Sequence, residues 1–290
     1  MKPAPFDYVR PGSLAEALEA LATIPDAKVL AGGQSLVPLL SMRLAAPAAL
    51  VDINGLEAEL GHVRSDREGV RVGALARHGA VERDARSREV QPLLSQALRL
   101  VAHATIRNRG TTVGSIAHAD AAAEMPTVLC LLDGHVEVAS VRGRRQIPAA
   151  DLFVGPLETA LEHDEILTEA WFPALAAGGG TAVDEVSRRH GDYALAGVGA
   201  LVLTDAGRVT RVRVGCLSLS DTPLVLDLTE AFHDGVVDEA ALTRAGELVE
   251  AQVQPEADIH ASADYRRHLA GVLTRRVVRQ AHASTREAVA

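Results

Sequence analysis

The sequence predicts an α+β protein in which small mixed units precede an antiparallel sheet that carries two long helices. Residues 1–55 alternate short strand and helix patterns, which is typical of a small α/β unit. Residues 181–220 contain three strand patterns joined by turns, and helical patterns follow at 238–253 and 261–281. A chain of 290 residues is long enough for two or three domains of ordinary size.

The N-terminal unit has the clearest local signals. Ser13 and Glu16 match a capping box in front of an apolar-periodic run, so we expect a helix to begin next to Ser13. We expect the other elements of this unit to be strands at 28–30 and 49–53 and a helix from Leu36. The turn-rich residues 54–63 then predict a boundary, which we place at residue 55.

The middle of the chain predicts a second mixed unit over residues 56–176. Pro126 is expected either in the first turn of its helix or at the true start of that helix. The glycine-rich residues 176–180 predict a linker, after which residues 177–290 form the third unit. The elements expected in the middle unit are a strand within 69–78, helices at 76–85, 90–103 and 121–132, a loop over 106–126, and strands at 135–140 and 165–173.

Composition argues against several classes of function. The net charge is −9 and aromatic residues make up 3%, so a polyanion-binding surface or a base-stacking platform is not expected. The short run at 141–145, "VRGRR", has the pattern of a solvated turn. No apolar run is long enough for a membrane span, and residues 1–13 lack the apolar segment of a secretory signal, so we expect a cytoplasmic protein. Cys130 and Cys216 are far apart in apolar surroundings and are expected to be buried thiols, not metal ligands.

Two glycine-containing loops could hold a diphosphate. Residues 31–35 read "AGGQS" between a predicted strand and a predicted helix, and residues 109–115 read "RGTTVGS". Glycine lets a backbone approach a ligand closely, and the N–H groups that begin a helix favour an anion. Neither loop is a Rossmann fingerprint or a Walker loop. From the residues alone, each loop could equally be an ordinary turn or a phosphate-binding loop.

Four ordered segments carry a resemblance to a known family. They are residues 28–53, 106–126, 155–173 and 186–202, and the similarity covers nearly the whole chain. The sequence resembles the FAD-binding medium subunit of molybdenum hydroxylases, of the carbon monoxide dehydrogenase medium-subunit type and related to the flavin domain of xanthine dehydrogenase. The resemblance implies a two-subdomain PCMH-type FAD-binding domain and a C-terminal domain with an antiparallel sheet plus helices.

The resemblance also implies a set of FAD-binding residues. The first loop would wrap the FAD diphosphate, and the second would hold it from the opposite side. Tyr193 matches a tyrosine that covers one face of the isoalloxazine, Leu167 lies near the position that flanks the ring, and Glu124 falls near the sugar or ribityl hydroxyls. The two loops and their edges would contribute Lys28, Ala31, Gly32, Gly33, Gln34, Ser35 and Leu36, together with Thr111, Gly114 and Ser115.

Val113 is a departure from the family pattern, which has glycine at this position in many members. A Cβ there would limit positive φ and the closest backbone approach, so the contact at Val113 is not expected to be conserved. His118 is compatible with a proton relay beside a flavin, although a hydrogen-bonded structural histidine is favoured. Asp120 is expected to cap the helix that follows it. No catalytic residue and no metal ligand is predicted on this chain.

The resemblance implies an oxidoreductase that works as one part of a complex. FAD would lie on this chain, molybdopterin on a large subunit and two [2Fe-2S] clusters on a small subunit, with electrons passing to FAD and then to an external acceptor. The assembly would be a dimer of heterotrimers. Two alternatives remain open: a self-standing FAD-dependent oxidase or reductase, and a non-catalytic nucleotide-binding scaffold subunit. The substrate and the acceptor are not encoded in these motifs.

Overall fold

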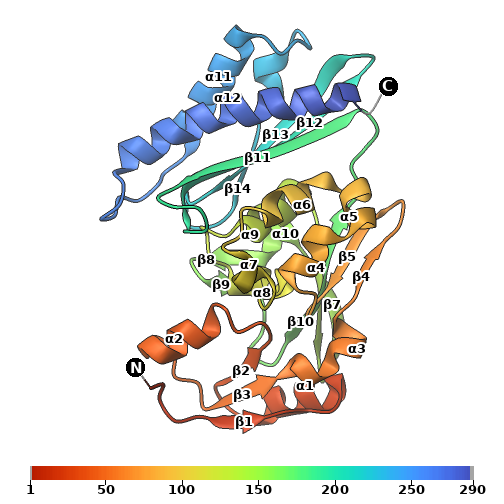
Figure 1. The fold of residues 1–290 in the computed structure, drawn as a ribbon, viewed down its shortest axis with the longest axis vertical. Coiled ribbons are helices and arrows are strands. Elements are labelled where there is room, and N and C mark those ends of the chain that lie inside the picture. The colour runs from red at the N-terminus through yellow and green to blue at the C-terminus, as the bar shows by residue number, and fades with distance from the viewer. Residues whose placement is uncertain (1, 288–290) are drawn as a thin grey trace.

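The three larger sheets of the described residues follow one another along the long axis of the molecule (Figure 1). The computed structural model describes residues 2–287. The N-terminal sheet and its helices lie at one end, a five-stranded sheet with most of the short helices lies in the middle, and a four-stranded sheet under two long helices lies at the other end. The predicted α+β class, with an antiparallel C-terminal sheet plus helices, is confirmed.

The N-terminal sheet is parallel, in the order β1–β3–β2. Its elements are β1 (Asp7–Val9), α1 (Leu14–Thr23), β2 (Ala27–Leu30), α2 (Leu36–Met42) and β3 (Ala49–Asp52). Ser13 caps α1 by accepting a hydrogen bond from the Glu16 N–H at 3.2 Å, as predicted. The Glu16 carboxylate accepts from Gly12, one residue earlier than in a standard capping box. The strand β1 had no sequence prediction.

The middle sheet has the order β4–β5–β10–β6–β7, and all its neighbours are antiparallel. Its strands are β4 (Val63–Ser65), β5 (Gly69–Gly73), β6 (His135–Ser140), β7 (Gly143–Pro148) and β10 (Ile166–Pro173), and β8 (Phe153–Gly155) pairs with β9 (Glu158–Thr159). The accompanying helices are η1 (Ile53–Leu56), α3 (Glu57–Leu60), α4 (His78–Arg83), α5 (Ala85–Val90), α6 (Pro92–Leu98), α7 (Ala104–Arg107), α8 (Thr112–His118), α9 (Glu124–Leu131) and α10 (Ala149–Leu152).

Three predictions in this unit were wrong in detail. The helix expected at 90–103 is only α6, because Pro92 starts it and the chain leaves helical geometry before Ala102, where φ is 42°. The loop expected over 106–126 contains α7 and α8. The helix expected from residue 121 begins at Glu124, so Asp120 is not its N-cap; its carboxylate instead accepts from the Ala122 N–H at 2.9 Å. Pro126 lies in the first turn of α9, which was one of the two expectations.

The C-terminal sheet is an antiparallel meander, β11 (Gly179–Ser187), β12 (Ala194–Asp205), β13 (Arg208–Leu217) and β14 (Leu224–Asp227). After η2 (Thr229–Phe232), α11 (Glu239–Gln252) and α12 (Ala263–Glu287) cover the sheet (Figure 1). The predicted linker at 176–180 extends too far, because Gly179 and Gly180 already belong to β11. Gly180 is needed there, since a Cβ would collide with the backbone of α12 at Ala281.

Two hydrophobic cores hold these sheets together. One buries residues between Leu14 and Phe172, and the other buries residues between Ala182 and Ala281. They meet where α9 packs on β13: a Cβ on Gly215 would be 2.8 Å from Cγ2 of Thr127. None of the helices among residues 2–287 has both the length and the hydropathy that a membrane crossing requires.

Candidate functional site

The two predicted ligand loops are in direct backbone contact. A Cβ built on Gly32 would lie 2.6 Å from the carbonyl oxygen of Arg109, 2.8 Å from Cα of Gly110 and 2.9 Å from the nitrogen of Thr111. Only glycine leaves room for this approach. The loop that follows β2 therefore packs on the segment that begins α8, although about eighty residues separate the two loops in the chain.

The first loop offers unpartnered backbone donors. Within residues 2–287, no hydrogen bond engages the N–H groups of the four residues from Gly32 to Ser35. Gly33 has a φ of 71°, a conformation that favours glycine. The Gln34 side chain donates from Nε2 to the Gly32 carbonyl at 3.1 Å, so one of its amide hydrogens has an internal partner. These residues are only half-buried, as a bed open to a ligand requires.

The second loop is held rigidly at its start. Thr111 is the N-cap of α8, and its hydroxyl accepts from the Gly114 N–H at 3.1 Å. A Cβ on Gly114 would be 2.5 Å from that same hydroxyl oxygen, which explains the glycine. Ser115, one residue further along α8, is half-buried. Its N–H donates to the Thr111 carbonyl at 3.0 Å, so this N–H is used inside the helix.

His78, the first residue of α4, packs against the second loop, and no sequence pattern marked it. Its Nδ1 lies 3.2 Å from the Thr112 hydroxyl, and its ring packs against Gly110. The side chain is 4% exposed, and this burial, with Arg107 nearby, lowers the pKa of His78 to about 4. A neutral imidazole at neutral pH follows, so His78 acts as a hydrogen-bonded support and contributes no positive charge.

Val113 does not disturb the second loop. It is the second residue of α8 and does not have a positive φ. Its side chain is 2% exposed and belongs to the core of the first two units. The Cβ therefore points away from the loop surface, and the position does not require glycine.

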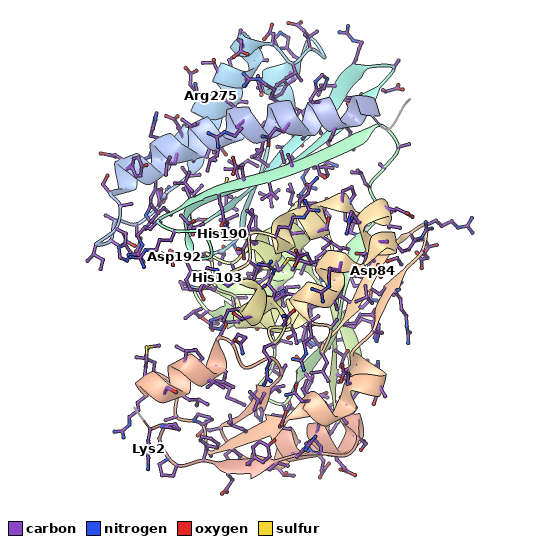
Figure 2. The ribbon with its side chains drawn as sticks, viewed as in Figure 1. Lys2, Asp84, His103, His190, Asp192 and Arg275 are labelled. Atoms are coloured by element: carbon purple, nitrogen blue, oxygen red, sulfur yellow. The ribbon has the colours of Figure 1, made fainter. Side chains whose placement is uncertain are left out.

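Tyr193 reaches this region from the C-terminal unit. The turn between β11 and β12 packs on the segment before α7: the rings of His103 and His190 are 6.1 Å apart, and Gly191, with φ of 87°, lies against the His103 ring (Figure 2). Tyr193 is 64% exposed, which leaves its ring free to cover a ligand. Partial burial of its hydroxyl, with Asp120 and Glu124 nearby, raises the pKa of Tyr193.

Two carboxyl groups with raised pKa values lie near this junction. Burial raises the pKa of Glu124 to about 7, and Asp120 adds to the shift. Burial and the charge of Glu124 raise the pKa of Glu185, on β11, to about 8. The Oε2 atom of Glu185 is buried and has no hydrogen-bond partner among the described residues. The sequence did not single out Glu185, because its partner lies in another unit.

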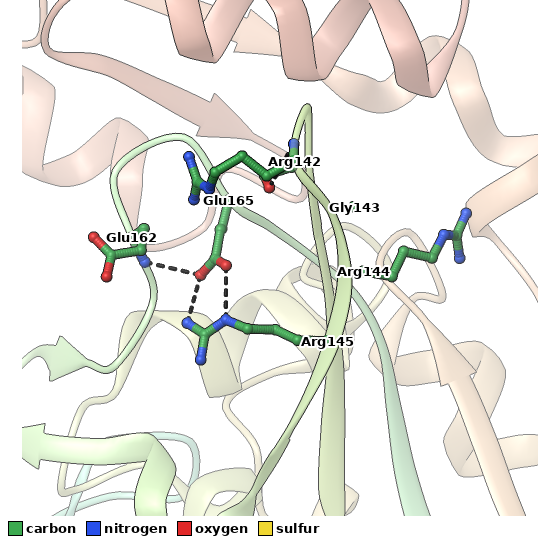
Figure 3. A pocket seen from close by; sticks show the side chains of 7 residues that line it. Arg142, Gly143, Arg144, Arg145, Glu162 and Glu165 are labelled. Carbon is green, nitrogen blue, oxygen red and sulfur yellow. Dashed lines mark hydrogen bonds and ion pairs between the residues drawn. The ribbon is translucent and has the colours of Figure 1, made fainter.

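The remaining predicted residues are dispersed. Lys28 is exposed on β2, and Leu36 is half-buried at the start of α2. Leu167 is 4% exposed and packs in the core on β10, whose other neighbours include α8. A cavity of about 280 Å³ beside the β6–β7 hairpin contains none of the predicted residues (Figure 3). In it, Glu165 accepts two 2.8 Å hydrogen bonds from Arg145, so this charge is neutralised.

The geometry agrees with the comparisons to known proteins. The sequence profile described as FAD binding domain in molybdopterin dehydrogenase matches residues 4–175, more than half of the chain. The chain belongs to this family. A second profile, the CO dehydrogenase flavoprotein C-terminal domain, matches residues 181–281 of the medium subunit.

Relatives agree over almost the full length of this medium subunit. It is 39% identical to the nicotine 6-hydroxylase medium subunit of Paenarthrobacter nicotinovorans, over 98% of this chain and 100% of that protein. It is 33% identical to the carbon monoxide dehydrogenase medium chain of Hydrogenophaga pseudoflava, over 98% and 99%. The solved carbon monoxide dehydrogenase of that organism superposes with a TM-score of 0.93 at 33% identity, over the same shares of the two chains.

The loop geometry fits the cofactor of this family. Unpartnered N–H groups, a glycine that permits backbone contact and a rigid second loop are what a diphosphate site needs. The chain is therefore an FAD-binding medium subunit of the molybdenum hydroxylase family and part of an oxidoreductase, as the sequence predicted. Its relatives are medium subunits of multi-subunit enzymes.

Proposed function

We propose that this chain carries FAD as the electron-transfer subunit of a heterotrimeric molybdenum hydroxylase. It would receive electrons from a small [2Fe-2S] subunit, next to a large molybdopterin subunit that oxidises the substrate, and pass them to an external acceptor. The contact of Gly32 with residues 109–111 is the observation that carries the proposal, because it joins both loops into one bed. We further propose that two such heterotrimers associate and that the three units divide at residues 55 and 176.

Bound FAD would supply reversible two-electron and one-electron chemistry. The chain would bind and orient it. We propose that the N–H groups from Gly32 to Ser35 bind the diphosphate from one side, with Lys28, Ala31 and Leu36 at the edges of the bed. Thr111, Gly114 and Ser115 would bound it on the other side. This arrangement uses backbone dipoles, so it needs few charged side chains.

The part of the site that holds the isoalloxazine and the sugar or ribityl hydroxyls would be formed by residues from three different elements. We propose that Tyr193 covers one face of the isoalloxazine, where its exposure leaves room, and that β10 flanks the ring at Leu167, whose side chain is buried in the core behind it. Glu124 would hydrogen-bond a sugar or ribityl hydroxyl. Because its pKa is raised to about 7, part of the Glu124 population is protonated at neutral pH and can donate a hydrogen bond as well as accept one.

Purification of the full chain with its neighbouring subunits tests the proposal. We expect a yellow complex whose flavin is reduced by substrate only when the large and small subunits are present. A chain that reduces its flavin with a small substrate and no partner would instead support a self-standing oxidase or reductase. A chain that binds a nucleotide but never FAD would support a scaffold subunit.

A further inference from the structure

Asn54 and Arg77 lie between the two loops and are hydrogen-bonded to both. The Asn54 amide donates from Nδ2 to the Ala31 carbonyl at 2.8 Å. Arg77 donates from Nη2 to the Asn54 side-chain oxygen at 2.7 Å and from Nη1 to the Arg109 carbonyl at 2.7 Å. Three hydrogen bonds therefore form one continuous relay from the backbone of the first loop to the backbone of the second.

The relay is itself anchored. Asp52, at the end of β3, accepts from the Asn54 N–H at 3.0 Å and from Nδ2 at 2.6 Å, and its other oxygen accepts from the Tyr8 hydroxyl. Asp52 is 8% exposed, so these bonds are sheltered from water. Arg77 immediately precedes α4, whose position is fixed by the His78 N–H that donates to the Gly110 carbonyl at 2.9 Å.

The relay controls which way the loop peptides face. In a planar trans peptide the carbonyl and the N–H point in opposite directions. When Asn54 holds the Ala31 carbonyl, the Gly32 N–H of the same peptide must point away from Asn54. The Arg109 carbonyl is held by Arg77, and its oxygen is also the atom that a Cβ built on Gly32 would meet first, at 2.6 Å. Carbonyl oxygens repel an anion and N–H groups attract it. With the Ala31 and Arg109 carbonyls held by Asn54 and Arg77, the loops are preorganised to bind a diphosphate through their N–H groups.

We propose that Asn54 and Arg77 are positioning residues that set the two loops in register for the FAD diphosphate without touching it. This inference rests on the proposed function, because it presumes that the diphosphate lies between the loops. Arg77 is suited to the role, since its planar fork can bond two oxygens at once. Lysine keeps the charge but has a single nitrogen and cannot reproduce that fork.

The test compares Asn54→Ala, Arg77→Lys and the double variant in the full chain freed of flavin. Dissociation constants for FAD and for riboflavin are measured by flavin fluorescence. Each single variant should weaken FAD by roughly tenfold, because a hydrogen bond that holds one of the loop carbonyls in place is lost. Riboflavin has no diphosphate, so its binding should change by less than about twofold. Arg88→Lys, an exposed arginine on α5, is the matched control and should match the wild type.

The double variant separates a relay from two independent contacts. In a relay the second substitution breaks a chain that is already broken, so the double variant should also weaken FAD by roughly tenfold. A loss of roughly a hundredfold would show additive effects and overturn the relay. FAD binding by Arg77→Lys at wild-type strength would show that charge alone matters, and this would also overturn it.

Hydrogen exchange gives a readout that does not depend on any ligand. In the flavin-free chain, Asn54→Ala should speed amide exchange in residues 108–112 as well as in 31–36, although Asn54 bonds only the first loop directly. Unchanged exchange in residues 108–112 would overturn the inference whatever the FAD result. A wild-type chain that binds no FAD would instead overturn the proposed function, while the exchange data would still decide the relay.

Discussion

Gly32 and Arg109 touch backbone to backbone, and a Cβ on Gly32 would lie 2.6 Å from the Arg109 carbonyl oxygen. The atoms that would have to move belong to the backbone, and Arg77 holds the nearest of them, the Arg109 carbonyl oxygen, so they cannot swing aside as the end of a flexible side chain could. Because of this contact, the first loop and the second loop pack together as one unit. The size of residue 32 therefore determines how far apart the loops stand.

Gly32→Ala should push the loops apart and weaken FAD binding by about ten- to hundredfold, the cost of overpacking a tight contact. Fluorescence titration of the flavin-free full chain measures the effect. Gly12→Ala is the control, because a Cβ there would meet its nearest atom, Glu16 Oε2, at an ordinary 3.5 Å. Wild-type FAD affinity in Gly32→Ala would mean that the ligand does not use both loops.

Local signals in the sequence predicted most of the elements. The Ser13 cap, the apolar strand at 135–140 and the long C-terminal helical patterns depend on neighbours within a few residues, and all appear in the structure. The exposed strand β7 was missed because only Ile147 of its six residues is buried, which leaves no alternating pattern. The helix expected at 90–103 was too long at both ends. Gln91, whose side chain donates to the Pro173 carbonyl, precedes its true start, and the chain leaves helical geometry before Ala102, where φ is 42°.

The candidate site was predictable only in its ligand loops. Glycines and hydroxyls within a few residues mark a loop, so the sequence predicts the two loops, at 31–35 and 109–115, that the structure brings into contact. Asn54, Arg77 and His78 act through partners 23 to 34 residues away, and Glu185 acts through a carboxyl in another unit. No local pattern distinguishes such residues from ordinary surface or core positions, because their roles are created by the fold.

Tyr193→Ala should change the flavin environment more than flavin affinity. The ring is 64% exposed, so its removal costs little stability, and stacking contributes only about 0.5–1.5 kcal/mol, a change in affinity of about two- to twelvefold. We expect brighter flavin fluorescence and faster quenching by iodide, because one face of the isoalloxazine becomes open. Tyr265→Ala removes a 46% exposed tyrosine from α12 and should change neither property. An unaltered spectrum in Tyr193→Ala would place the ring elsewhere.

Asp133→Asn should loosen the junction between the FAD-binding unit and the C-terminal sheet. Asp133 forms a two-point ion pair with Arg213 on β13, whose side chain is only 10% exposed. Asparagine tolerates the left-handed backbone of residue 133, so the charge is the main loss. The Asp133 carboxylate is 65% exposed and water screens part of the pair, so we expect the free energy of unfolding to fall by about 1–2 kcal/mol in urea titration. Asp264→Asn breaks an exposed pair and should cost less than about 1 kcal/mol; an equal cost in both variants would contradict the assignment.

Glu185 should make the flavin-free chain less stable as pH rises. Burial and the charge of Glu124 raise the pKa of Glu185 from an ordinary 4.5 to about 8, and Asp184 acts in the same direction. Between these values the folded chain binds more protons than the unfolded chain, so the free energy of unfolding falls with increasing pH. Glu124, with a pKa raised to about 7 by burial and Asp120 and opposed by Arg107, contributes in the same way over a narrower window.

Glu185→Gln should remove its share of this dependence, because a neutral amide occupies the same volume and needs no proton. The share is about 1.4 kcal/mol for each pH unit inside the window. Urea unfolding at intervals from pH 5 to pH 8 measures the slope, and the variant should be more stable than the wild type at pH 8. Glu247→Gln alters an exposed carboxyl on α11 and should leave the slope unchanged. Parallel curves for wild type and Glu185→Gln would show that Glu185 titrates as an ordinary surface acid.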